Sequence, residues 1–296
     1  MDCTNYLLNR KQMVDAELER LLSQADQTPP VLHEAIRYCL FAGGKRLRPV
    51  LAIAAAEALG SQPEAVLCEA CALELLHTYT LIHDDLPSMD NDDMRRGKPT
   101  AHTVYGEALA ILAGDALQAE AFAVLASSTR HTPAALIQVI HLLAEACGPR
   151  GIVGGQVVDL LSEGKPVTRE TLEYIHSHKT GCLITASVML GALLARTDRT
   201  PPTQLTALQT YGTAIGLAFQ ITDDILDVTS TSDKLGKTAG ADEKRGKATY
   251  PAVLGLEEAR KTQAQLYQKA LDALAEFGEQ ADPLRYIARI IIERSS

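Results

Sequence analysis

The most informative stretch of this 296-residue chain is Leu81-Ile82-His83-Asp84-Asp85-Leu86-Pro87-Ser88-Met89-Asp90-Asn91-Asp92-Asp93. Five aspartates fall within ten residues, at the end of a segment whose apolar residues recur at helical spacing. The C-terminus of a helix already carries partial negative charge, so carboxylates gathered there are destabilising without a counter-ion. Such oxygen ligands suit Mg²⁺, which takes one or two carboxylates together with substrate phosphates. A solvated acidic loop is the alternative.

A second acidic cluster lies 139 residues further along and reads Gln220-Ile221-Thr222-Asp223-Asp224-Ile225-Leu226-Asp227. Asp223 and Asp227 are four residues apart and share one face of a helix, with Gln220 and Asp224 on the same stripe. Because apolar residues flank this stripe, we expect it to face the interior. Two such clusters favour a common cation site over two solvated surfaces.

Composition and periodicity predict an all-α fold. Aromatic residues make up only 4% of the chain and Trp is absent, which is a low aromatic content for a β-sandwich or barrel. No linker of low complexity divides the chain, so residues 1–296 are expected to form one domain, and no stretch alternates long enough to predict a strand. The predicted helices cover residues 31–42, 50–60, 63–83, 106–127, 133–146, 169–195, 203–228, 251–276 and 283–293.

Charge and cysteine usage exclude several functions. A net charge of -9 argues against a general binder of nucleic acid or of anionic membranes. No uncharged apolar run reaches the ~20 residues of a membrane span, and the first twenty residues do not resemble a signal peptide. The six cysteines are scattered, and Cys68 and Cys71 have no second pair with which to complete a metal site. We therefore expect reduced thiols and a cytoplasmic location.

Basic residues supply the charge that the aspartates lack. The candidates are Gly43-Gly44-Lys45-Arg46-Leu47-Arg48-Pro49, Arg95, Arg96, Lys179, Lys237 and Lys247. Paired glycines let the backbone approach a ligand closely, and guanidinium groups match phosphate oxygens. Arg95 and Arg96 have the alternative of pairing with the neighbouring aspartates. Gly236-Lys237-Thr238 is not a P-loop, because Thr231 stands where that motif requires glycine.

A rival interpretation comes from two Glu-x-x-His pairs. Glu74 with His77 and Glu173 with His176 have the spacing found in di-iron helical bundles. That interpretation leaves both aspartate clusters and every lysine and arginine unexplained.

Together these motifs resemble the trans-isoprenyl diphosphate synthases, and more closely the bacterial farnesyl diphosphate synthases. The motifs are Asp84-Asp85 with Asp90 and Arg95-Arg96, Asp223-Asp224 with Asp227, Gly43 to Pro49, and Gly246-Lys247-Ala248-Thr249-Tyr250-Pro251. The resemblance runs from about residue 30 to the C-terminus. It implies an all-α isoprenoid-synthase bundle around a central cavity, and a homodimer. The implied reaction is the head-to-tail condensation of isopentenyl diphosphate with dimethylallyl or geranyl diphosphate to farnesyl diphosphate.

The resemblance also implies roles for individual residues. The implied Mg²⁺ ligands are Asp84, Asp85, Asp90, Asp223 and Asp227. The groups implied to hold the allylic diphosphate are Arg95, Lys179, Lys237 and Lys247. Those implied to hold isopentenyl diphosphate are Gly44, Lys45, Arg48, His77 and Arg96. Thr180 and Gln220 are expected beside the reacting allylic carbons, where with Lys179 they form the catalytic set.

The chemistry agrees with these residue types. A diphosphate leaves readily only when Mg²⁺ and cationic side chains neutralise it, and the allylic cation then needs a dry apolar surrounding. The double bond of isopentenyl diphosphate attacks the cation, and the released diphosphate is the expected proton acceptor. Residues 229–249 form a polar stretch that we expect to act as a lid over the phosphates.

Product length is predicted from the helix that precedes Asp84. Tyr79 lies five residues earlier, roughly 7.5 Å deeper along a helix, and spacing alone places Thr80 directly beneath Asp84. In the family a bulky aromatic residue at the position of Tyr79, together with the two extra residues between the aspartates, accompanies a fifteen-carbon product. The stretch from Met89 to Pro99 also resembles geranylgeranyl diphosphate synthases, so a twenty-carbon product is the alternative.

Two further alternatives concern activity itself. A silent regulatory subunit of a heteromeric prenyl synthase usually loses one aspartate motif, and this chain has both. A terpene cyclase normally carries Asn, Ser or Thr, and Glu in the second motif, where this chain has three aspartates. Some relatives also end in a basic tail that helps to close the site, whereas the last residues here include a single arginine, Arg294.

Overall fold

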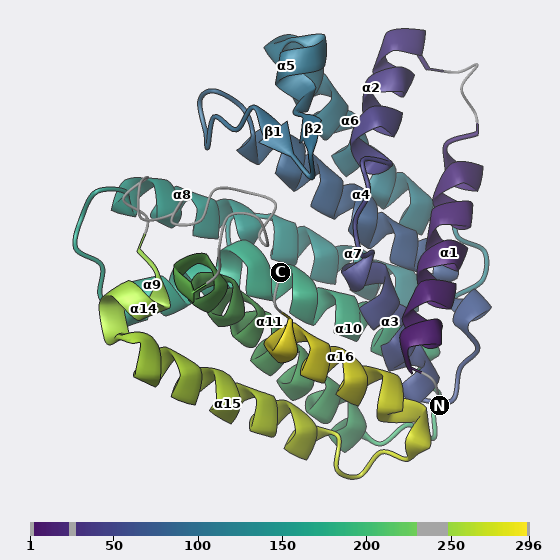
Figure 1. Cartoon of the computed structure of the whole chain (residues 1–296). Helices are drawn as coiled ribbons and strands as arrows, with labels where there is room; N and C mark the ends of the chain where they lie inside the picture. The colour runs from purple at the N-terminus through teal and green to yellow at the C-terminus, as the bar shows by residue number, and fades with distance from the viewer. Residues whose placement is uncertain (1–2, 24–27, 230–247, 295–296) are drawn as a thin grey trace.

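Helix α4 (Leu67–Asp84) carries the first aspartate cluster at its C-terminal end and is buried over most of its length (Figure 1). Even Glu69 and Glu74 on this helix are buried, as expected for a helix that is surrounded by others on every side. The computed structural model describes residues 3–23, 28–229 and 248–294. Within these ranges the regular secondary structure is helical, apart from one two-stranded antiparallel hairpin formed by β1 (Met94–Arg95) and β2 (Lys98–Pro99).

The remaining elements follow in chain order. They are α1 (Cys3–Leu21), α2 (Pro30–Leu40), α3 (Leu47–Ala58), η2 (Pro63–Ala65), α5 (Ala101–Tyr105), α6 (Glu107–Ala126), α7 (Pro133–Cys147), α8 (Ile152–Ser162), α9 (Arg169–Ile175), η3 (His176–Gly181), α10 (Cys182–Ala195), α11 (Pro202–Thr229), α14 (Tyr250–Leu254), α15 (Leu256–Ala273), η4 (Glu279–Ala281) and α16 (Asp282–Glu293).

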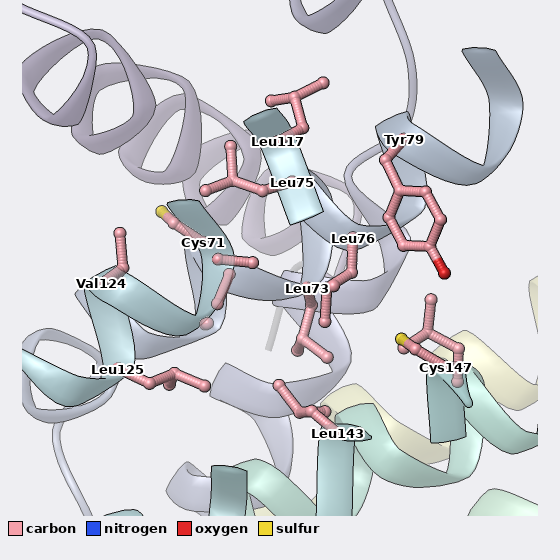
Figure 2. Packing of buried hydrophobic residues seen from close by; sticks show 14 of the residues in the cluster. Cys71, Leu73, Leu75, Leu76, Tyr79, Leu117, Val124, Leu125, Leu143 and Cys147 are labelled. Atoms are coloured by element: carbon pink, nitrogen blue, oxygen red, sulfur yellow. The ribbon is translucent and has the colours of Figure 1, made fainter. Parts of the chain in front are cut away.

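Two apolar clusters form one continuous core. The first gathers side chains of α4, α6 and α7, and Figure 2 shows Leu73, Leu76 and Leu143 packed together within it. The second gathers side chains of α3, α10, α11 and α16. Helices α3 and α10 contribute to both clusters and pack against each other, so the chain forms a single all-α domain. This confirms the predicted fold class.

The first and last helices pack together on one side of the bundle. Helix α1 packs against α16, where the Thr4 and Tyr286 hydroxyl groups share a hydrogen bond of 3.0 Å. In Figure 1 the C-terminal end of α16 lies beside α11, the helix that carries the second aspartate cluster. The last described residues therefore approach the predicted site.

The structure corrects several predicted helix boundaries. Helices α1 and α8 were not predicted, since α1 buries only three side chains and α8 contains two adjacent glycines that lower helix propensity. The single helix predicted over residues 169–195 is interrupted by the π-helical turn η3, and that predicted over 251–276 is broken at Gly255, whose φ is 82°. At α8 and η3 tertiary packing outweighs the local propensity, whereas the break at Gly255 follows from the positive φ that glycine adopts.

Three helical segments have the length and apolar composition of membrane spans: Glu107–Ala126, Pro133–Ser162 and Arg169–Ala195. The sequence prediction, which required an uncharged run, found none. Length and composition alone do not place these segments in a membrane. In this fold they pack against one another and against α4 and α3.

Candidate functional site

The first aspartate cluster is held by the backbone at the end of α4. The amide of Asp90 donates to the Asp84 carbonyl at 2.9 Å, and the amide of Asp92 donates to the Asp85 carbonyl at 3.2 Å. Asn91 takes a left-handed conformation, with φ of 51°, which turns the chain back on the helix. These bonds satisfy carbonyl groups that a helix end otherwise leaves exposed, and they gather the aspartates around that end.

The carboxylates of this cluster differ in their surroundings. Asp85 is buried and receives hydrogen bonds from Arg95, including one of 2.8 Å from Nε. The alternative pairing considered for Arg95 is therefore present in the absence of ligands. Burial raises the pKa of Asp84 to about 6; Lys179 opposes this rise, and Asp90 and Asp85 add to it. A shielded carboxylate among like charges favours the arrival of a cation.

The second cluster does not form one stripe, which corrects the sequence prediction. Asp223 is partly exposed and pairs with Arg294, whose Nη2 lies 2.9 Å from Oδ1. Asp224 is buried and points elsewhere, because its Oδ2 accepts from His176 Nε2 and from the Tyr250 amide, both at 2.8 Å. Asp227 is buried. Successive residues of a helix are turned by about 100°, so Asp224 lies on a different face from Asp223.

The π-helical turn η3 presents Lys179 and Thr180 side by side. Lys179 Nζ donates to Asp159 of α8 at 2.7 Å, and its charge also interacts with that of Asp84 in the first cluster. Thr180 donates to Gln220 Oε1 at 3.1 Å. The predicted catalytic set therefore comes from two elements, η3 and α11, and contacts of Lys179 link it to α8 and to the end of α4. Turns of π-helix occur frequently at functional sites.

Helices η3 and α11 cross closely enough to require glycine at the contact. A Cβ atom at Gly216 would lie 2.9 Å from the Gly181 Cα. This crossing holds Thr180 against Gln220, whose Nε2 in turn lies 3.4 Å from Asp223 Oδ2. The second aspartate cluster and the π-helical turn are thereby fixed relative to each other.

A group of cationic side chains surrounds His77. Burial lowers the pKa of His77 well below its usual value, and the guanidinium groups of Arg48, Arg96 and Arg95 lower it further. In the part of the chain that the structure describes, no carboxylate forms an ion pair with Arg48 or Arg96, and the Arg48 Nε is buried without a hydrogen-bond partner. Guanidinium groups without a direct ion pair suit a diphosphate, whose oxygens can accept their hydrogen bonds.

The glycine pair next to these arginines allows the guanidinium of Arg96 to approach. Gly44 has φ of 126°, and a Cβ atom there would lie 2.6 Å from Arg96 Nη1. Arg96 donates to the Gly43 carbonyl. Arg46, between Lys45 and Arg48, has a different role: it is buried and pairs with Asp15 at 2.7 Å and Glu74 at 2.8 Å. Lys45 is exposed and lines an apolar pocket together with Phe219 and Arg294.

The residues predicted to set product length lie inside the core below Asp84. Tyr79 is 5% exposed, and its ring meets the His83 ring edge-on at 5.8 Å. Figure 2 shows the Tyr79 hydroxyl directed toward Cys147 of α7. Thr80 is also buried, but its hydroxyl donates to the His77 carbonyl at 2.8 Å, back along its own helix. Tyr79 therefore reaches away from α4, whereas Thr80 does not.

Neither Glu-x-x-His pair has the arrangement of a di-iron site. Glu74 is held by Arg46, and Glu173 receives hydrogen bonds from Arg169 and Tyr250, each at 2.8 Å. Among the residues described, no three His, Cys, Asp or Glu side chains are placed to hold one metal ion. That result does not count against Mg²⁺, which commonly keeps water and substrate phosphate as its other ligands. The shielded, like-charged oxygens around Asp84 fit such an ion.

Some predicted residues cannot be placed. Lys237, Lys247 and nearly all of the predicted lid at 229–249 lie outside the described residues. Lys45, Arg48, His77, Arg95, Arg96, Lys179, Thr180 and Gln220 all lie within the described residues.

Sequence reasoning missed two side chains that contact the predicted site. Asp159 holds Lys179, and Arg294 holds Asp223 while donating to the Phe219 carbonyl at 2.7 Å. Asp159 stands alone in the sequence beside Val157 and Val158, and no local pattern marks it. The lone arginine near the C-terminus was noted, but its contact with the second cluster depends on the packing of α16 against α11.

An all-α bundle with two acidic clusters, arginines that form no ion pair with a carboxylate among the described residues, and a buried apolar region is the combination expected of enzymes that act on prenyl diphosphates. Comparison with known proteins agrees. Residues 29–288 match the family model described as polyprenyl synthetase. The chain therefore belongs to the polyprenyl synthetase family, whose members extend prenyl chains.

Three relatives show how far the likeness extends. The geranylgeranyl diphosphate synthase of Cyanophora paradoxa is 48% identical, with 98% of this chain and 96% of that protein covered. The farnesyl diphosphate synthase of Geobacillus stearothermophilus is 45% identical, with 98% and 97% covered. The crystal structure of geranylgeranyl pyrophosphate synthetase from Pyrococcus horikoshii Ot3 superposes with a TM-score of 0.90 at 32% identity, covering 99% of this chain and 98% of that one.

Proposed function

We propose that this chain condenses isopentenyl diphosphate with dimethylallyl and geranyl diphosphate and releases mainly farnesyl diphosphate. The observation that carries the fifteen-carbon product is the buried ring of Tyr79, which projects from α4 toward Cys147 below the first aspartate cluster (Figure 2). A prenyl chain that grows from the diphosphate end along α4 meets this ring about 7.5 Å below Asp84. The ring then stops further growth by steric contact.

Different side chains bind the two diphosphate substrates. The Arg48, Arg96 and His77 group binds isopentenyl diphosphate, because its two guanidinium groups form no ion pair with a carboxylate among the described residues. Lys179, anchored by Asp159, and Arg95, anchored by Asp85, bind the allylic diphosphate. The anchors hold each cation in place before the substrate arrives, which reduces the entropy lost on binding.

Ionisation breaks the bond between the allylic carbon and the diphosphate oxygen, and the electron pair leaves with the diphosphate. Asp84, Asp85, Asp90, Asp223 and Asp227 would hold Mg²⁺, which when bound would neutralise charge on that leaving group. The oxygens of Thr180 and Gln220 stabilise the allylic cation by their dipoles, and the apolar core keeps water away from it. After the new carbon–carbon bond forms, a proton passes to the released diphosphate.

A second candidate is geranylgeranyl diphosphate as the main product. It is favoured by relatives that are named geranylgeranyl diphosphate (or pyrophosphate) synthases and are up to 48% identical to this chain. One is from Cyanophora paradoxa and others are from plant chloroplasts. The mechanism and all the site residues are the same in this candidate. Only the depth of the apolar region below Asp84 differs.

One product assay separates these candidates. Purified protein is incubated with Mg²⁺, dimethylallyl diphosphate and labelled isopentenyl diphosphate, then dephosphorylated and analysed by gas chromatography. Farnesol as the main product supports the proposal, and geranylgeraniol supports the second candidate. A folded protein that extends no substrate contradicts both and favours a silent regulatory subunit.

We also propose that the chain acts as a homodimer. Large apolar side chains are exposed along three consecutive, contacting helices, α6, α7 and α8. They are Ile111, Leu112, Ile137, Val153, Val157 and Leu161. Light scattering after gel filtration tests this face: Leu112→Glu should give a monomer, whereas Val31→Glu on α2, similarly exposed, should leave the dimer intact. A wild-type protein that elutes as a monomer contradicts the proposal.

A further inference from the structure

Gln156 on α8 is buried without any hydrogen bond to its side chain. The residue is 7% exposed, and neither Oε1 nor Nε2 has a partner within the residues that the structure describes. A carboxamide can make several hydrogen bonds, so leaving both ends unpaired is destabilising. An apolar residue of the same size would avoid that cost. A buried amide of this kind points to a ligand that satisfies it.

Gln156 lies on α8 between a residue of the apolar cluster and a residue that pairs with Lys179. Ile152, Gln156 and Asp159 stand at i, i+4 and i+7, which is one face of the helix. Ile152 belongs to the apolar cluster that contains Tyr79, and Asp159 pairs with Lys179. By helix rise, Gln156 lies about 6 Å from the level of Ile152 and about 4.5 Å from that of Asp159.

The contact between α8 and η3 holds Gln156 at this level. A Cβ atom at the neighbouring Gly155 would lie 2.4 Å from the Lys179 amide nitrogen, so the two backbones are in direct contact. Helix α8 therefore cannot shift along η3 without breaking this contact and the Asp159–Lys179 pair. Gln156 is thereby fixed close to Lys179 and Thr180.

The side-chain oxygen of Gln220, which is expected to face the reacting carbons, already accepts a hydrogen bond within the protein. Gln220 Oε1 accepts a hydrogen bond from Thr180 at 3.1 Å, and Gln220 Nε2 lies 3.4 Å from Asp223. One lone pair of this oxygen is thus occupied in the absence of substrate. The Gln156 amide is not engaged in this way.

We propose that Gln156 is a further catalytic residue, which contacts the allylic substrate at the carbon–oxygen bond that breaks. Its Oε1 faces the carbon that becomes cationic, and its Nε2 donates to the diphosphate oxygen that receives the electron pair. Both contacts strengthen as charge separates, so they lower the barrier more than they favour substrate binding. The inference rests on the proposed reaction, which places that bond beside Lys179 and Thr180.

The test compares Gln156→Met and Gln156→Leu with Gln138→Met, an exposed glutamine on α7 given the same change. Both Gln156 variants should unfold at a temperature equal to or above that of the wild type, since the unpaired amide is gone. Their kcat should fall at least about 30-fold while KM for each substrate changes less than about threefold. Gln138→Met should match the wild type throughout.

A binding measurement separates a catalytic contact from a structural one. Calorimetry with Mg²⁺ and pyrophosphate compares an ammonium analogue of the allylic cation with a neutral analogue of the same shape. Gln156→Met should lose at least about tenfold of the preference for the ammonium analogue. If the wild type forms product and the Gln156 variants keep both its kcat and its preference for the ammonium analogue, the role of Gln156 is overturned and the proposed function is not. A wild type that forms no product overturns the proposed function and this inference with it.

Discussion

Replacing Tyr79 by alanine should lengthen the product from fifteen to twenty carbons. The ring is buried between α4 and α7, with its hydroxyl toward Cys147, and the helix carries it about 7.5 Å below Asp84 (Figure 2). Truncation removes the obstacle and leaves a cavity in the first apolar cluster, to which Tyr79 belongs.

The magnitude follows from filling that cavity. Truncation of a large buried aromatic residue destabilises a protein by about 3–5 kcal/mol. A five-carbon prenyl unit that occupies the hole recovers about 0.8 kcal/mol for each buried CH₂ group, or roughly 3–4 kcal/mol in all. Since about 1.4 kcal/mol corresponds to a factor of ten, kcat/KM for farnesyl diphosphate as the allylic substrate should rise on the order of 10²-fold.

The assay measures product lengths and kcat/KM for dimethylallyl, geranyl and farnesyl diphosphate. Tyr79→Phe keeps the ring and should leave the product unchanged. Thr80→Ala should also have no effect on product length, because the Thr80 hydroxyl bonds to the carbonyl of His77 on its own helix. Tyr79→Leu is a milder truncation, for use if the alanine variant unfolds. An unchanged product from a folded truncation variant would refute the reasoning and place the stop elsewhere.

Three further variants test the charged groups. Asp84→Ala should lower kcat at least about 10²-fold, the effect of losing one electrostatic stabiliser, and near-normal turnover would contradict its role as a metal ligand. Asp159→Asn should raise KM for the allylic substrate about tenfold without changing KM for isopentenyl diphosphate, because Lys179 loses its anchor; equal changes in both constants would count against this division. Arg294→Gln should lower the Mg²⁺ concentration for half-maximal rate up to about fivefold, since a partly exposed pair with Asp223 is worth up to about 1 kcal/mol; an unchanged Mg²⁺ dependence would show that the pair does not compete with the metal.

Many individual contacts of the site could not be predicted from the sequence. Arg46 and Arg48 are two residues apart in one basic motif, yet Arg46 forms ion pairs with Asp15 and Glu74, whereas Arg48 forms none with the described carboxylates. Neither partner of Arg46 is near it in the sequence. Helix α8, with its adjacent glycines, is a poor helix by propensity and is held by its contact with η3. Its two site residues, Asp159 and Gln156, were therefore missed.

What the sequence by itself determined is the helical class, the positions of most helices and the two aspartate clusters. These are local properties, because apolar spacing and runs of like charge are visible within ten to twenty residues. The tertiary structure alone decided which of the neighbouring carboxylates lies where: Asp223 toward Arg294, and Asp224 toward His176 and Tyr250. The physical reason is that a side chain's partner is set by which helices cross, and residues distant in the sequence form those crossings.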